Sequence, residues 1–176
     1  MEYSLTTPLK AEEIEMLHAG DRVLLSGIIY TARDAAHERM TRLFNEGTPF
    51  PIDLATSAIY YAGPCPPKPG EVIGSCGPTT SGRMDAYTPL LIENGLRVMI
   101  GKGERNSEVK KLIADNKAVY LGAIGGAGAL IAECIKSAEI AAYEDLGTEA
   151  VRKLTVENLP LTVIVDCEGC DLYTKK

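Results

Sequence analysis

Short apolar runs alternate with amphipathic segments along most of this chain, and that alternation limits the folds open to it. Residues 22–30 read as a buried strand, and residues 32–45 carry apolar side chains at helical spacing. Because strands that alternate with helices usually pair in parallel, the pattern predicts an α/β layer fold. We see no internal repeat and no linker, so residues 1–176 are expected to form a single domain.

The other expected elements are shorter. Thr31 is a candidate N-cap for the helix at 32–45, and the proline-rich segment 63–70 is expected to be irregular. An edge strand and a turn of helix are expected within residues 5–17. Further strands are expected at 58–62, 71–74, 96–100, 118–122, 138–143 and 161–166, and further helices at 84–94, 107–116, 126–136 and 148–154.

Composition and charge argue against several classes of protein. The chain has 176 residues, 45% of them hydrophobic, and a net charge of -6 without any lysine or arginine run. This charge balance argues against a nucleic-acid partner. The sequence shows no N-terminal apolar signal and no long uninterrupted apolar span, so we expect a cytoplasmic protein with no membrane partner.

Five cysteines are scattered along the chain, an odd number that favours free thiols over a disulfide framework. Cys167 and Cys170 form a lone CxxC motif after an expected strand. A zinc or redox site normally needs a second ligand pair or a position at the start of a helix. A turn carrying two thiols is therefore the favoured interpretation, with a metal or redox role as the alternative.

The glycine-rich segment 74–85 carries the strongest candidate chemistry. Its glycines allow backbone N–H groups to face a ligand, and the start of the helix expected there favours an anion. Thr79 and Thr80 add two hydroxyls, Arg83 adds a fixed positive charge, and Asp85 adds a carboxylate. The simpler alternative, a helix N-cap with polar loop packing, accounts for one hydroxyl but not for the whole set. The spacing does not match a P-loop, because no Gly-Lys-Ser/Thr follows.

A second charged loop follows the strand expected at 22–30. Arg33 and Asp34 come directly after that strand, and His37 lies one helical turn further on. Ligand sites in α/β folds gather in such loops, and the planar guanidinium of arginine suits a carboxylate. The alternatives are a salt bridge from Arg33 to Glu38 and a surface or capping histidine.

A lysine completes the set of candidate residues. Lys102 lies between two glycines after the strand expected at 96–100, where it could approach a ligand closely; the alternative is an exposed lysine in a turn. Arg33, Arg83 and Lys102 together suggest a substrate with more than one carboxylate, and the threonine pair suggests proton transfer. The chain has no evident set of metal ligands and no convincing nucleophile–base pair, so it looks like half of an active site.

Several motifs resemble those of a known enzyme family. They are GIIYTARDAAH at 27–37, YAGP at 61–64, GPTTSGRMD at 77–85 and IGKG at 100–103. Together, over nearly the whole chain, they resemble the β subunit, or C-terminal domain, of class I iron–sulfur fumarate hydratases and L-tartrate dehydratases. Each motif alone is weak, and their shared order makes the resemblance specific.

The resemblance implies a fold, a partner and a reaction. The fold would be a three-layer swivelling β/β/α domain, like the mobile domain of aconitase-type enzymes. The partner would be an α subunit, in a heterodimer or an α2β2 assembly, that holds a [4Fe–4S] cluster through three cysteines, so that this chain alone binds no cofactor or metal. The activity would be that of a hydro-lyase, the reversible hydration of fumarate to L-malate, present only with the α subunit. The alternatives are an L-tartrate dehydratase β subunit and a non-enzymatic module that binds small dicarboxylates.

The same resemblance implies roles for individual residues. The residues that match the family's contacts to substrate carboxylates are Arg33, Arg83 and Lys102. One threonine of the pair Thr79 and Thr80 matches the catalytic threonine, with Thr79 favoured, and the family's activating aspartate comes from the α subunit. The accessory candidates from the same loops are Asp34, His37 and Asp85. The CxxC motif departs from the family pattern.

Overall fold

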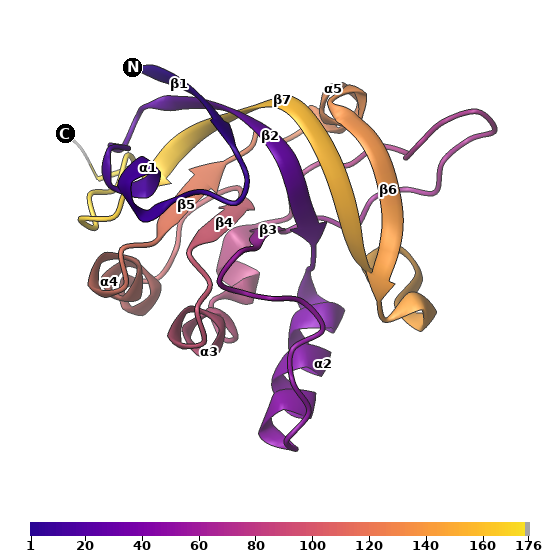
Figure 1. Ribbon diagram of the computed structural model, residues 1–176, viewed down its shortest axis with the longest axis horizontal. Coiled ribbons are helices and arrows are strands. Elements are labelled where there is room, and N and C mark those ends of the chain that lie inside the picture. The colour runs from indigo at the N-terminus through magenta and orange to yellow at the C-terminus, as the bar shows by residue number, and fades with distance from the viewer. Residues whose placement is uncertain (175–176) are drawn as a thin grey trace.

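The computed structural model describes residues 1–174, and within them a seven-stranded sheet is accompanied by helices (Figure 1). The strands are β1 (Glu2–Thr6), β2 (Arg22–Thr31), β3 (Ala58–Tyr60), β4 (Val98–Gly101), β5 (Val119–Gly122), β6 (Ile135–Ala142) and β7 (Val151–Val165). The helices are α1 (Ala11–Glu15), α2 (Asp34–Asn45), α3 (Thr88–Glu93), α4 (Ser107–Asp115) and α5 (Gly128–Glu133), with 3₁₀ helices η1 (Ser81–Met84) and η2 (Glu144–Glu149). The mixed α/β class predicted from the sequence is confirmed.

Five of the strands pair in a closed ring. Strands β1 to β5 pair in parallel, each with the next one along the chain. Strand β7 runs antiparallel and pairs with β5, β6 and β2. The pairings therefore run from β2 through β3, β4, β5 and β7 back to β2, while β1 and β6 each pair with a single member. Because β2 to β5 are parallel, their carboxyl ends meet at one edge of the sheet.

Two apolar clusters lie on opposite faces of the central strands. Along β4, Val98 and Ile100 belong to one cluster and Met99 to the other, as the two-residue period of a strand requires. The second cluster also includes buried side chains of α2, α3 and α4, and Figure 1 shows these three helices on the same side of the strands. Strands β3 to β5 are buried on both faces, which explains why their sequences are apolar at successive positions.

Two expected elements are wrong, and a third is shorter than predicted. The segment 148–154 is not a helix, because β7 begins at Val151 and pairs along its length with β2 and β6. The helix expected at 84–94 is present only over α3, which η1 precedes, and Pro89 lies near the start of α3, where its fixed φ is tolerated. Residues 71–74 form no strand, and nothing in the structure explains their difference from the expectation.

The start of α2 also differs from the expectation. Thr31 remains in β2 and does not cap the helix; its hydroxyl accepts the Arg152 N–H and donates to the Ala150 carbonyl. The N-cap position is Arg33, whose side chain makes no capping hydrogen bond. By contrast, α4 is capped by Asn106, whose side chain accepts the Val109 N–H. None of the helices in residues 1–174 is both long and apolar enough to cross a membrane.

Candidate functional site

The candidate site is formed by loops that leave the carboxyl ends of the parallel strands. Arg33 follows β2, the threonine loop (residues 77–83) comes after β3, and Lys102 follows β4. The threonine loop is held in place by backbone hydrogen bonds: Thr79 N–H donates to the Tyr61 carbonyl (2.7 Å), and Ser81 N–H donates to the Lys102 carbonyl (2.9 Å). The structure thus brings the residues predicted from three separate segments to one edge of the sheet.

Arg33 and Arg83 are joined through one carboxylate. Asp34 lies between them, with Oδ1 3.0 Å from Arg83 Nε and Oδ2 3.4 Å from Arg33 Nε. Glu149 adds a second contact to Arg33 Nε at 3.4 Å, so the expected pairing of Arg33 with Glu38 is not the one that forms. Both arginines use Nε toward Asp34, and the Nη groups of Arg83, whose side chain is 53% exposed, remain available to an incoming carboxylate.

The threonine pair lies beside Lys102. Thr79 is partly exposed and Thr80 is exposed, and within residues 1–174 neither hydroxyl has a hydrogen-bond partner. Thr80 forms a parallel β-bridge with Lys102 and precedes η1 without capping it, so the N-cap alternative does not account for its hydroxyl. The Lys102 side chain runs over Gly125, where a Cβ would come within 3.3 Å of its Cδ. No carboxylate in the described part of the chain pairs with Lys102, which leaves its charge free for a ligand.

His37 is a buried residue behind Arg33, neither on the surface nor at a helix cap. Its Nδ1–H donates to the Arg33 carbonyl (2.9 Å), and its ring packs edge-on against Tyr61, with ring centroids 5.5 Å apart. Burial lowers its pKa to about 4, so the ring is neutral at pH 7. His37 Nε2 has no hydrogen-bond partner within residues 1–174. These contacts favour a role in holding the start of α2 over direct contact with a ligand.

Asp85 is bound by residues outside the threonine loop. Its carboxylate is buried, with Oδ1 2.6 Å from Arg105 Nε, and Oδ2 accepts the Asn106 N–H. Arg105, which the sequence reasoning missed, also donates to Thr88 Oγ1 (2.8 Å) and to the Tyr61 hydroxyl (3.2 Å). One signal was available: Arg105 is a second cation in the loop after β4, immediately before the cap residue of α4.

The cysteines do not form a metal site within the described residues. All five are free thiols, and no group of three or more His, Cys, Asp or Glu residues among residues 1–174 could hold a metal ion. The CxxC segment is a turn in which Asp166 Oδ1 accepts the N–H groups of Glu168 and Cys170, both at 3.0 Å. Cys76, next to the threonine loop, is buried, and burial raises its pKa to about 12, so its thiol is unreactive.

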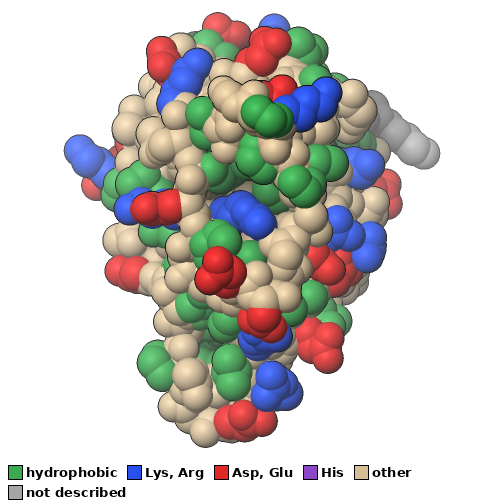
Figure 2. Space-filling view, turned by 90° about the vertical axis from the view of Figure 1, so that its right-hand side faces the viewer, with side chains coloured by type: hydrophobic (Ala, Val, Ile, Leu, Met, Phe, Trp, Pro, Cys, Tyr) green, Lys and Arg blue, Asp and Glu red, His purple; other side chains and the backbone are tan. Residues whose placement is uncertain are grey.

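Exposed apolar side chains flank the site on the loop and helix that follow β5. Ile124 is 68% exposed and Leu130 is 66% exposed. Between them, Gly125 lies against Lys102, and the backbone of Gly128 lies near that of Gly77. On the face turned toward the viewer in Figure 2, hydrophobic side chains lie among acidic and basic ones, and neither sign of charge forms a continuous field. Exposed apolar side chains therefore border the site on the side of β5.

Comparison with known proteins identifies relatives along the whole chain. The family model described as "Fumarase C-terminus" matches residues 1–176. Fumarate hydratase 2 of Leishmania major is 39% identical over 166 residues, which is 93% of this chain and 29% of that protein. The anaerobic class I fumarate hydratase of Escherichia coli K12 is 38% identical over 173 residues, 96% of this chain and 32% of that protein.

A shorter relative matches along almost its entire length. The putative L(+)-tartrate dehydratase subunit beta of Methanocaldococcus jannaschii is 38% identical over 179 residues, 98% of this chain and 91% of that protein. The chain thus spans about a third of the length of the fumarate hydratases it matches but nearly the full length of a separate β subunit.

Proposed function

We propose that this chain, which belongs to the family described as Fumarase C-terminus, is the substrate-binding β subunit of a hydro-lyase. The reaction we assign is the reversible hydration of fumarate to L-malate. The single observation that carries the proposal is the meeting of Arg33, Arg83 and Lys102 at the carboxyl edge of β2 to β4 with two threonine hydroxyls that have no partner within residues 1–174. Three cations around two hydroxyls suit a small dicarboxylate that must lose or gain a proton.

In this proposal the three cations bind the substrate, and a threonine transfers the proton. Arg33 and Arg83, oriented through Asp34, would hold one carboxylate, and Lys102 would hold the other from across the threonine loop. A threonine hydroxyl would carry the proton at the carbon next to a carboxylate. A free threonine is a poor base, so it needs an activating group. Within residues 1–174 no carboxylate or neutral imidazole contacts either hydroxyl, and we therefore assign the activator to a partner chain.

The iron–sulfur cluster of this enzyme class also belongs, in our proposal, to the partner. Such a cluster needs several cysteine thiolates together and, when bound, supplies a Lewis acid for the substrate hydroxyl. The described residues do not fit it, because they contain no group of three or more candidate ligands. The part of the site formed by this chain is limited to binding, orientation and proton transfer.

The partner would be an α subunit, in a heterodimer or an α2β2 assembly. The match to a protein named as a subunit beta supports a separate partner, and the longer fumarate hydratases support the same two parts within one chain. The exposed Ile124 and Leu130 beside Lys102 offer an apolar border that a partner covering the site would bury. A cytoplasmic location, expected from the sequence, and the swivelling β/β/α fold name, which rests on the family resemblance, are further parts of this proposal.

L-Tartrate is the second candidate substrate, favoured by the name of the Methanocaldococcus relative. Its dehydration requires the same clamp and the same proton transfer, so the ratio of kcat/KM for L-malate to that for L-tartrate decides between the two. A non-enzymatic dicarboxylate-binding module is the remaining alternative, and it predicts binding without turnover.

The experiment that tests the proposal is anaerobic co-expression with an α-type chain followed by assay of fumarate hydration. We expect activity only in the complex, and Thr79→Val should reduce kcat by about 10²- to 10⁴-fold, the usual contribution of a proton-transfer group. Thr80→Val is the matched control, because it makes the same change one residue away, and it should retain most of the activity. Activity of this chain alone would contradict the two-subunit proposal, and equal losses in both variants would leave Thr79 without its special role.

A further inference from the structure

The threonine loop rests on a buried serine. Ser81 directly follows Thr80 and is fully buried, and its N–H donates to the Lys102 carbonyl. Its Oγ lies 2.8 Å from the hydroxyl of Tyr120, a residue of β5. Gly101 lacks the Cβ that would overlap Ser81 Oγ, so the close approach of these two loops depends on that glycine. Ser81 is therefore the point at which the threonine loop is fixed to the sheet.

Tyr120 contacts both loops of the candidate site with one hydroxyl. Besides Ser81 Oγ, the hydroxyl lies 2.8 Å from the carbonyl oxygen of Gly103, the residue after Lys102. A carbonyl only accepts, so the Tyr120 proton goes to Gly103, and Ser81 donates its own proton to the tyrosine oxygen. Burial raises the pKa of Tyr120, which keeps the phenol protonated as this arrangement requires.

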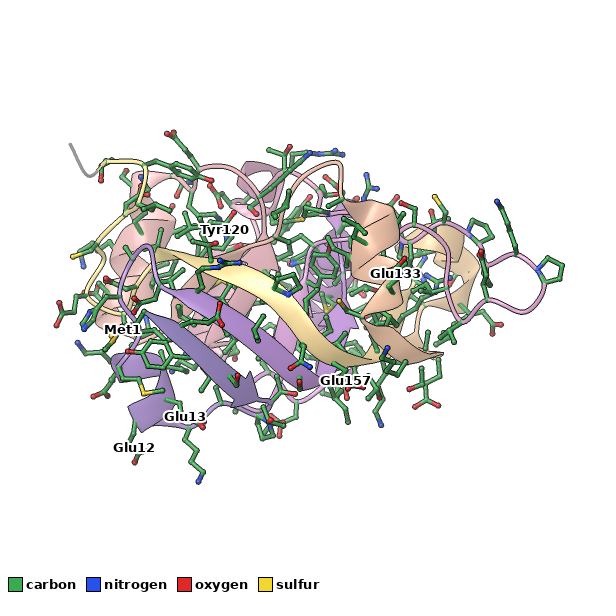
Figure 3. The ribbon with its side chains drawn as sticks, turned by 90° about the horizontal axis from the view of Figure 1, so that it is seen from above. Met1, Glu12, Glu13, Tyr120, Glu133 and Glu157 are labelled. Carbon is green, nitrogen blue, oxygen red and sulfur yellow. The ribbon has the colours of Figure 1, made fainter. Side chains whose placement is uncertain are left out.

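The Tyr120 ring packs against the guanidinium of Arg105. The guanidinium carbon lies 5.0 Å from the centroid of the Tyr120 ring and 5.2 Å from that of Tyr61, whose carbonyl accepts the Thr79 N–H. Arg105 is fixed in turn by its short contact with Asp85. Tyr120 is fully buried, and Figure 3 shows it among other side chains, whereas the labelled Glu12 and Glu13 lie at the edge of the molecule in that view.

We propose that the Tyr120 hydroxyl is a positioning group that sets the distance between the threonine loop and Lys102. This inference rests on the proposed function, because it assigns a catalytic purpose to the separation of those two loops. Tyr120 does not touch the substrate in this view. It acts through Ser81 and Gly103, and its loss would let the threonine hydroxyls move relative to the lysine. Displacements of about 1 Å in a catalytic group can cost about 10²-fold in rate.

The test is Tyr120→Phe, which removes one oxygen and keeps the ring that Arg105 packs against. Tyr60→Phe is the matched control, because Tyr60 is another buried tyrosine, on β3, whose hydroxyl donates to a backbone carbonyl, that of Cys76 (2.6 Å). In the assembled enzyme we expect Tyr120→Phe to lower kcat about 10- to 100-fold and Tyr60→Phe to change it by less than about threefold. Urea unfolding should show a similar loss of stability for both variants, which separates positioning from general destabilisation.

A second measurement does not depend on activity. Amide hydrogen exchange of this chain should show about five- to tenfold faster exchange of the Ser81 N–H in Tyr120→Phe but not in Tyr60→Phe. Ser81→Ala removes the same side-chain hydrogen bond from the other side, and the double variant should lose little more than either single one. Unchanged Ser81 exchange, or faster exchange with unchanged kcat, would overturn the proposal. If the wild-type complex has no hydro-lyase activity, the proposed function fails, and the exchange result alone then decides whether Tyr120 fixes the two loops.

Discussion

Two arginine–aspartate pairs of this molecule, one buried and one exposed, differ in what each can do. The buried pair, Arg105 with Asp85, has an arginine side chain with 0% exposure and an N–O distance of 2.6 Å. The pair at the site, Arg83 with Asp34, has an arginine that is 53% exposed and an N–O distance of 3.0 Å. Arg83 and Asp85 are only two residues apart in the sequence, yet they belong to different pairs. Burial makes the Arg105–Asp85 pair part of the fold, whereas exposure allows Arg83 to exchange Asp34 for a ligand.

The largest expected effect comes from breaking the buried pair. Asp85→Ala leaves the Arg105 charge buried without its carboxylate, and we expect the free energy of unfolding to fall by about 3–5 kcal/mol. Urea unfolding followed by circular dichroism measures this loss. A loss no greater than that of Asp34→Ala would show that burial does not separate the two pairs.

The buried histidine under Arg33 should give the next largest effect, through pH. The folded-state pKa of His37 is about 4, below the value of about 6.5 expected when unfolded, so below pH 6.5 the unfolded chain binds a proton that the folded chain does not. Stability is therefore lost as pH falls from about 6.5 to 4, by about 3 kcal/mol in total for this group. His37→Gln should remove that part of the pH dependence, and the exposed His18→Gln should not; identical pH profiles for all three proteins would contradict this assignment.

Truncation of the exposed arginine should affect turnover and leave the fold intact. Arg83→Ala removes a charged hydrogen-bond donor for a substrate carboxylate, and we expect kcat/KM of the complex to fall about 10- to 100-fold, equivalent to about 1.5–3 kcal/mol. The free energy of unfolding should change by about 0.5 kcal/mol or less, as for most exposed positions. Arg39→Ala is the control: Arg39 binds Asp145 on the surface and should leave kcat/KM unchanged.

The smallest expected effect is on the stability contributed by the exposed pair itself. Asp34→Ala should lower the free energy of unfolding by less than about 1 kcal/mol, and the loss should shrink further near 1 M salt because the pair is partly exposed and screened. Unfolding at two salt concentrations measures it. A loss of several kcal/mol that is independent of salt would mean that Asp34 is structural in the way that Asp85 is.

The sequence was a good guide where local chemistry decides structure and a poor one where distant contacts do. Local signals correctly predicted α2, α4 and the alternation of strands through β5. The strand β7 was missed over its first ten residues, because Val151 to Leu154 resembles a helix until β2 and β6 supply hydrogen-bond partners on both sides. Pairing across more than a hundred residues leaves no local trace that a window of sequence can reveal.

For the candidate site, the sequence by itself determined the kinds of groups present: arginines, a lysine and two hydroxyls after strands, with glycines where loops must approach closely. Only the tertiary structure decided which of these residues lie together. Arg83 pairs with Asp34 at the start of α2, whereas Asp85 pairs with the buried Arg105. The Tyr120 hydroxyl contacts both the threonine loop and the loop of Lys102. The reason is physical: a residue's chemistry is set by its side chain, but its partner, its burial and therefore its charge environment are set by segments that meet only when the sheet closes.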